Sequence, residues 1–172
     1  MKALVGTKTT VVEHAASVLD IDFKSLRRAG VECVIFDLEG TVTEWRGTDV
    51  AAEVRRHIKE LGITKIGVAT NMHHSRGAEV EKLARQLGAG SFQFPRARGD
   101  RKPAATMLEA CMAELKARPE QTVMVGDKLL DVLAAKKAGV GRAIWVEKFG
   151  RVDHWFDRLV YRKIEPFLKR LF

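Results

Sequence analysis

The stretch Val34-Ile35-Phe36-Asp37-Leu38-Glu39-Gly40-Thr41 places two carboxylates directly after an apolar run and then turns at a glycine. An apolar run that ends in polar residues and glycine predicts a buried strand that opens into a loop. Residues two apart in an extended chain point the same way, so Asp37 and Glu39 can converge on one ligand. Such a pair at a strand end suits a metal ion and a phosphate group; the simpler alternative is a strand whose solvent end carries two charges.

Three later segments favour a functional site over that alternative. The polar pair Thr70-Asn71 follows a second apolar run, near 65–69. Lys102 stands directly before a proline and a helical stretch, and a third apolar run, 122–125, opens into Gly126-Asp127 with Asp131 beyond. A nucleophile, a hydroxyl, a lysine and an acid therefore occur in chain order, and this set is more specific than any of its members alone.

The periodicity of the chain predicts an α/β fold. Apolar runs near 33–37, 65–70, 91–94, 122–126 and 143–146 alternate with helical patterns near 50–60, 76–87, 104–117 and 131–138. Alternating strands and helices indicate right-handed βαβ units and a mostly parallel, Rossmann-like sheet with helices on both faces. In such sheets ligands bind beyond the carboxyl ends of the strands, which is where Asp37, Thr70 and Asp127 are expected.

These motifs resemble those of the haloacid dehalogenase (HAD) superfamily of phosphohydrolases. The chain is similar in particular to the capless subfamily IIIA of YqeG-type proteins, which are related to phosphatidylglycerophosphate phosphatases. The marks of that branch cover nearly the whole chain: Asp20-Ile21-Asp22, Trp45, Thr70-Asn71, Arg101-Lys102-Pro103, Gly126-Asp127-Lys128-Leu129-Leu130 and Ala143-Ile144-Trp145-Val146. The resemblance implies a Mg²⁺-dependent phosphomonoester hydrolase.

The resemblance also implies roles for the acidic residues. Asp37 would be the nucleophile that forms an aspartyl phosphate. Mg²⁺ would be held by Asp37, Asp127 and the backbone carbonyl of Glu39, since oxygen ligands suit this ion. The side chain of Glu39 would protonate the leaving oxygen and then activate water.

The remaining motif residues would act on the phosphate. Thr70 would donate its hydroxyl to a phosphoryl oxygen, and Lys102 would supply positive charge near the nucleophile. Asn71 would bond either the loop backbone or the substrate. Asp131 would orient Lys102 or a water on the metal.

Two departures from the family pattern concern the rate of reaction. Glu39 stands where the family has aspartate, and the interval from Asp127 to Asp131 is one residue shorter than in close relatives. Glutamate keeps the acid–base function but adds a methylene, and a displacement of about 1 Å can cost on the order of 10²-fold in a positioned reaction. Two interpretations follow: an active phosphatase, or a noncatalytic HAD-fold protein that binds or regulates.

The intervals between motifs leave no room for a cap domain. The segment from Val42 to Asp49 is too short for a separate lid. An uncapped site would accept a large, membrane-embedded or macromolecular substrate, or a partner subunit of a homo-oligomer would cover it. Phosphatidylglycerophosphate is one candidate substrate; a sugar phosphate, a nucleotide and a phosphoprotein are others.

Composition favours one domain spanning residues 1–172, since 46% of the residues are hydrophobic and the length suits a single domain of ~100–200 residues. Cys33 and Cys111 form no CxxC pair and are expected in the core, in a reducing compartment. No apolar run approaches the ~20 residues that span a bilayer. We therefore expect a cytoplasmic protein.

The formal net charge of +8 favours anionic partners. The segment near 153–171 reads as a basic amphipathic helix, which would either contact anionic lipid or pack on the protein. Nucleic acid is disfavoured because the chain has no zinc-binding pattern and no RNP-type aromatic motif. A nucleotide-binding switch is disfavoured because the chain has no P-loop.

Overall fold

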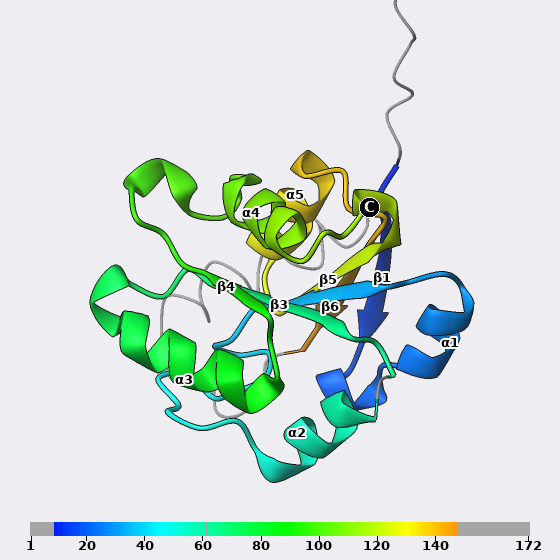
Figure 1. Ribbon diagram of the computed structural model, residues 1–172, viewed down its shortest axis with the longest axis horizontal. Helices are drawn as coiled ribbons and strands as arrows, with labels where there is room; N and C mark the ends of the chain where they lie inside the picture. Colours follow the sequence, from blue (N-terminus) through cyan, green and yellow to red (C-terminus); the bar gives the residue numbers. More distant parts are fainter. Residues whose placement is uncertain (1–8, 61, 148–172) are drawn as a thin grey trace, which may run out of the picture.

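The computed structural model describes residues 9–60 and 62–147, which form a parallel sheet between two layers of helices (Figure 1). The strands are β1 (Val11–Ala15), β2 (Cys33–Phe36), β3 (Lys65–Ala69), β4 (Ser91–Gln93), β5 (Thr122–Gly126) and β6 (Arg142–Val146). The α-helices are α1 (Phe23–Arg28), α2 (Ala52–Lys59), α3 (Gly77–Leu87), α4 (Thr106–Glu114) and α5 (Leu129–Lys137).

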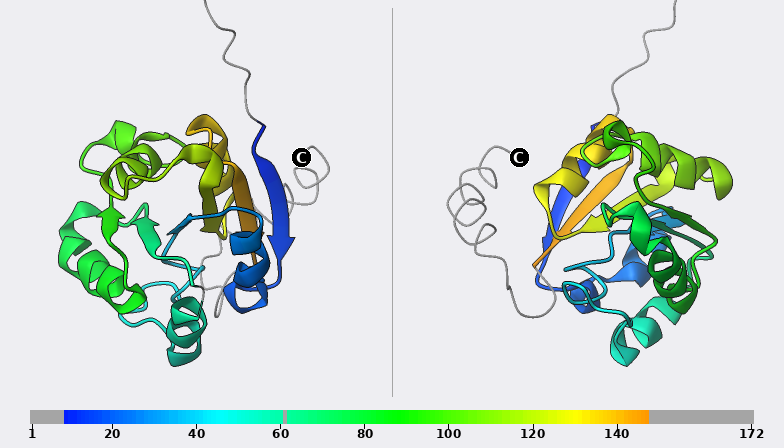
Figure 2. Two further views of the ribbon diagram at one scale, coloured as in Figure 1. Left: turned by 45° about the vertical axis from the view of Figure 1, so that its right-hand side comes forward. Right: turned by 90° about the vertical axis from the view of Figure 1, so that its left-hand side faces the viewer.

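The strand order is β1-β6-β5-β2-β3-β4, and every described strand pair is parallel. The predicted α/β fold with a parallel, Rossmann-like sheet is therefore confirmed. Two elements were not predicted, the strand β1 and the helix α1. Figure 2 shows β1 beside β6 at the edge of the sheet, where it extends the sheet by one strand.

Alternation along each central strand builds two hydrophobic cores. In β2, Val34 and Phe36 face the core that receives α1, α2 and α3, whereas Cys33 and Ile35 face the core that receives α4 and α5. Successive side chains of a strand point to opposite faces, so a strand buried on both faces is apolar throughout. All four β2 residues are fully buried. Figure 1 shows the two helical layers on opposite sides of the sheet.

The central strands bring the predicted motifs to one edge. β2 lies between β5 and β3, and all three run in the same direction. The backbone N–H of Asp37 donates to Val125 O at 2.9 Å, which continues the pairing of β2 with β5 one residue past β2. Segments that are far apart in sequence therefore open into loops side by side.

The connections around this edge agree with a site that has no cap domain. Only residues 37–51 separate β2 from α2. Within the described part of the chain, no helix is long and apolar enough to cross a membrane. The helix predicted near 153–171 lies outside the described residues.

Candidate active site

The loop after β2 is a compact turn that brings its backbone against Asp127. Leu38 O accepts hydrogen bonds from the N–H groups of Thr41 and Val42, at 3.1 and 3.0 Å. Gly40 has φ +84°, a conformation that glycine adopts without steric cost. A Cβ atom at Gly40 would lie 2.5 Å from Asp127 Oδ2. Glycine is thus required for this loop to approach the carboxylate.

Three carboxylates gather beside that loop. Asp37, Asp127 and Asp131 are buried, and each offers an oxygen within 4.8 Å of those of the other two. Asp37 follows β2, Asp127 follows β5, and Asp131 belongs to the first turn of α5. The backbone of Asp127 is held from the next strand, because Trp145 Nε1 of β6 donates to Asp127 O at 3.0 Å.

Lys102 places a buried ammonium among these acids. Its Nζ lies 2.5 Å from Asp131 Oδ1 and 2.9 Å from Asp37 Oδ1, and it donates to Ala69 O at 2.7 Å. The contact with Asp37 is an ion pair rather than a well-directed hydrogen bond. Burial alone would lower the pKa of Lys102, but Asp131 and Asp37 outweigh it and raise that pKa. The lysine is therefore a fixed positive charge at neutral pH.

Asn71 ties the lysine loop to the loop after β3. Its Nδ2 donates to Lys102 O at 3.1 Å, and its Oδ1 accepts from Lys102 N at 2.8 Å. Arg101 adds a bond to Asn71 O at 3.0 Å. Of the two predicted roles of Asn71, the structure contains the bond to the loop backbone; substrate binding stays a prediction.

Thr70 is the first residue after β3 and is 2% exposed. Its N–H donates to Gln93 O at 3.1 Å, and its Oγ1 accepts from Met72 N at 3.4 Å. The backbone bond fixes the residue at the edge of the sheet, on the wall of a cavity that Asp37 also lines.

The carboxylate cluster fits a magnesium ion held by two of its members. Asp131 already receives Lys102 on Oδ1, and its Oδ2 accepts from Lys128 N at 3.0 Å. Asp37 and Asp127 are then the side chains best placed to hold a cation, beside the loop that carries the Glu39 carbonyl. Oxygen donors in a buried cluster are the ligands that Mg²⁺ prefers.

The cavity at this edge has a volume of about 250 Å³. Trp45 at its wall is 42% exposed, and Lys128 Nζ lies 5.5 Å from the centre of the Trp45 ring. The lining residues are Asp37, Glu39, Trp45, Thr70, Asn71, Met72, Arg101, Lys102, Lys128, Leu130 and Asp131. The predicted site residues thus meet in one place, with Asp127 joined to them through the carboxylate cluster.

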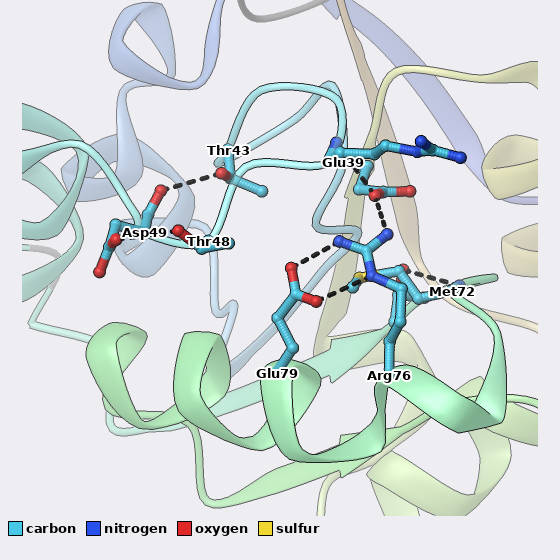
Figure 3. A network of polar contacts seen from close by, with 9 residues as sticks. Glu39, Thr43, Thr48, Asp49, Met72, Arg76 and Glu79 are labelled. Atoms are coloured by element: carbon cyan, nitrogen blue, oxygen red, sulfur yellow. Dashed lines mark hydrogen bonds and ion pairs between the residues drawn. The ribbon is translucent and has the colours of Figure 1, made fainter.

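Glu39 has a partner that the sequence analysis did not predict. Arg76 Nη1 lies 2.5 Å from Glu39 Oε1 (Figure 3). The N–H of Arg46 donates to the same oxygen at 3.2 Å. Arg76 ends the short 3-10 helix His74–Arg76 before α3, far from Glu39 in sequence. Its spacing of three residues from Glu79 was a helical ion-pair signal, but nothing in the sequence linked it to Glu39.

The family model of haloacid dehalogenase-like hydrolases matches residues 45–139, more than half of the chain. The chain belongs to this family. It is 28% identical over 165 residues to "Probable phosphatase YqeG" of Bacillus subtilis (strain 168). The aligned region covers 92% of this chain and 90% of that protein. The predicted resemblance to HAD phosphatases of YqeG type is confirmed, and with it the prediction of a phosphatase enzyme.

A shorter match joins the chain to a sugar-phosphate enzyme. Over 68 residues it is 41% identical to D-glycero-beta-D-manno-heptose-1,7-bisphosphate 7-phosphatase of Haemophilus ducreyi, covering 35% of this chain and 37% of that protein.

Solved structures agree on the fold. The chain superposes on the crystal structure of CbbY of Rhodobacter sphaeroides in complex with xylulose-(1,5)bisphosphate, with a TM-score of 0.51. The two sequences are 18% identical, and the match covers 69% of this chain and 87% of the CbbY chain. A HAD family hydrolase from Deinococcus radiodurans R1, with bound phosphate and sodium, gives a TM-score of 0.50 and 15% identity, over 69% and 81%.

Proposed function

We propose that this protein is a Mg²⁺-dependent phosphomonoesterase that works through an aspartyl phosphate on Asp37. The observation that carries the proposal is the setting of Asp37, whose buried carboxylate lies 2.9 Å from the Lys102 ammonium and within the acidic cluster of Asp127 and Asp131. Phosphoryl transfer depends mainly on positioning and charge stabilisation, and this arrangement supplies both.

In the first half of the reaction, a carboxylate oxygen of Asp37 attacks phosphorus, and the bond from phosphorus to the leaving oxygen breaks. Glu39 gives its proton to that oxygen, so the product leaves as an alcohol. Thr70 donates a hydrogen bond to a phosphoryl oxygen, and Lys102 offsets negative charge on the transferring group.

In the second half, Glu39 takes a proton from a water molecule as that water attacks the phosphorus of the aspartyl phosphate. The bond between phosphorus and Asp37 breaks, which releases inorganic phosphate and restores the free carboxylate. Asp131 holds Lys102 in place during both halves, through the 2.5 Å contact with its ammonium.

Asp37, Asp127 and the backbone carbonyl of Glu39 would hold the magnesium ion. When bound, the ion supplies positive charge that reduces the repulsion between the nucleophile and the phosphate.

We propose that the substrate is a phosphomonoester whose phosphate is accessible, with phosphatidylglycerophosphate as the first candidate. The described connections around the cavity are short and include no separate cap domain, which suits a phosphate presented by a large molecule or a membrane surface. A sugar phosphate is the second candidate, because the local match to the heptose bisphosphate phosphatase supports it.

The test is phosphate release by the purified full-length chain and by Asp37→Asn, each with Mg²⁺ or with EDTA. The substrates are phosphatidylglycerophosphate in vesicles, sugar phosphates, nucleotides and a phosphopeptide. We expect selective, metal-dependent turnover that Asp37→Asn lowers by at least about 10³-fold, as for the loss of a covalent nucleophile. Asp20→Asn, which changes an exposed carboxylate outside the cavity, is the matched control.

A folded wild-type protein that binds Mg²⁺ but releases no phosphate from any of these substrates would contradict the proposal. That result would favour the noncatalytic interpretation of Glu39.

A further inference from the structure

Arg76 connects two carboxylates that come from different parts of the fold. Its Nε and Nη2 donate to the two oxygens of Glu79, at 2.8 and 2.5 Å, and its Nη1 donates to Glu39 Oε1 at 2.5 Å. Figure 3 shows the guanidinium between Glu79 on α3 and Glu39 on the loop after β2. A planar guanidinium held on both sides in this way has little freedom to turn.

The anchor on α3 is independent of the proposed active site. Glu79 lies in the first turn of α3, three residues after Arg76, and both side chains are partly buried. The hydrogen bonds of Glu79, followed by those of Glu39, raise the pKa of Arg76, although burial opposes them. Arg76 is therefore a permanent cation whose place is set by the helix.

Only one oxygen of Glu39 takes part in this network. Oε1 accepts from Arg76 and from the backbone N–H of Arg46, whereas Oε2 makes no hydrogen bond or ion pair with residues 9–60 or 62–147. Glu39 itself lines the cavity that holds Asp37. The pairing thus fixes the carboxylate through Oε1 and leaves Oε2 for contact with a ligand in the cavity.

The length of the Glu39 side chain is what allows this contact. An aspartate at this position is shorter by one C–C bond, about 1.5 Å. Its carboxylate would then lie farther from Arg76, by up to about 1.5 Å, and the present 2.5 Å contact would be weakened or lost.

We propose that Arg76 is a positioning residue that holds the Glu39 carboxylate in the place from which its second oxygen transfers protons. The inference rests on the proposed function, in which Glu39 is the acid–base group. Arg76 does not line the cavity that holds Asp37, and we infer that it acts through Glu39. It explains how a longer side chain serves at this position, because the extra methylene brings the carboxylate to an anchor that an aspartate would reach less well.

The test compares Arg76→Met in two backgrounds, the wild type and Glu39→Asp. The readouts are kcat and KM for the best phosphomonoester identified with the wild-type enzyme. In the wild-type background we expect kcat to fall at least about tenfold with KM changed less than about twofold, because a misplaced acid–base group slows chemistry more than binding. In the Glu39→Asp background we expect Arg76→Met to change kcat less than about twofold, because the pair is already weakened or lost.

Arg85→Met is the matched control. It also removes an arginine–glutamate pair from α3, since Arg85 Nη2 lies 2.5 Å from Glu81 Oε1, but neither residue lines the cavity. We expect unchanged kcat. Arg76→Lys keeps the charge and should recover part of the loss if pairing with Glu39 is the cause.

Equal losses of kcat in both backgrounds would overturn the inference, because Arg76 would then act through the start of α3. No loss in either background would overturn it as well. These outcomes differ from a failure of the proposed function, in which the wild type itself releases no phosphate or Asp37→Asn retains full activity. If the enzyme is inactive, thermal unfolding can still test the pairing of Arg76 with Glu39. Arg76→Met should then lower Tm less in a Glu39→Gln background than in the wild type. The same change in Tm in both backgrounds would contradict the pairing.

Discussion

Two features disfavour a side chain at Gly40, the backbone φ of +84° and the close approach of Asp127. Gly40→Ala would put a methyl group 2.5 Å from Asp127 Oδ2, so the carboxylate or the loop must move. We expect a loss of phosphatase activity on the order of 10²-fold, because an error of about 1 Å in a reacting group has that effect. Steady-state kinetics on the purified variant would measure it.

Gly88→Ala separates the two causes. Gly88 has φ +71° at the end of α3, but nothing lies within 4 Å of the position of its Cβ. We expect that variant to lose about 1 kcal/mol of unfolding free energy from backbone strain and to keep its activity. Equal losses of activity in both glycine variants would show that the approach to Asp127 has no special part in catalysis.

Lys102→Met tests the buried ion pairs. The change leaves Asp37 and Asp131 without their ammonium partner, and removal of one member of a buried charge pair costs about 3–5 kcal/mol. We expect a decrease of this size in the free energy of unfolding, measured by denaturant titration at neutral pH. Since the native pKa of Lys102 is raised, the wild type keeps this stabilisation at neutral pH and loses it only as pH rises above the ordinary lysine range.

Arg98→Met, at an exposed residue before the same loop that does not line the cavity, is the control for stability and should change it by less than about 0.5 kcal/mol. If the Lys102→Met variant has the same midpoint of denaturant unfolding as the wild type, the lysine is not what stabilises the two carboxylates.

The residues that sequence could identify are those whose position along the chain carries the signal. Asp37, Thr70 and Asp127 each follow an apolar run, and the fold needs only parallel strands to bring them together. Arg76 differs, because its contact with Glu39 depends on how the loop after β2 folds back toward α3. Nothing in the local sequence around Arg76 encodes that approach.

At the scale of elements, periodicity identified the central strands and the edge strand β4, and it missed the other edge strand, β1. β2 and β5 are buried throughout, whereas β1 has a mixed pattern in which Val11 is 50% exposed and His14 is also exposed. An edge strand that pairs on one side has fewer apolar positions to fill. Its partner β6 is also distant in sequence, so only the folded sheet shows β1 as a strand.

Both cysteines lie in the core between the sheet and the helices α4 and α5, and this burial predicts low thiol reactivity. Cys33 on β2 and Cys111 on α4 are fully buried in the same core, and neither forms a disulfide. Burial raises the pKa of Cys33 to about 11 and that of Cys111 to about 12, so both thiols stay protonated in the native protein. We expect a thiol reagent such as DTNB to label these two cysteines no faster than the protein unfolds, as measured by absorbance and by unfolding rate.

The same pKa values set a direction for stability. Thiols ionise in the unfolded chain near pH 9 and at higher pH in the native state, so the unfolding free energy should fall as pH rises from about 9 toward 11. Rapid labelling of one thiol per chain under native conditions, with the fold intact by circular dichroism, would contradict the burial of that cysteine.

At the scale of the whole molecule, the sheet gathers the chemistry at one edge. Alternating strands and helices were enough to predict a parallel sheet with a site at its carboxyl end. The strand order β1-β6-β5-β2-β3-β4 was not predictable in the same way, because it depends on packing between segments far apart in the chain. That order is what makes β2 the neighbour of both β3 and β5 and places Asp37 between Thr70 and Asp127.

The proposed mechanism requires that Asp37 becomes covalently phosphorylated during turnover. The most direct measurement is an acid quench of the enzyme with its best substrate and Mg²⁺, followed by mass spectrometry of the intact chain and of its peptides. We expect one hydroxylamine-sensitive phosphoryl group on the peptide that contains Asp37 and none in Asp37→Asn. Turnover with the phosphoryl group on another residue, or undiminished turnover by Asp37→Asn, would contradict it.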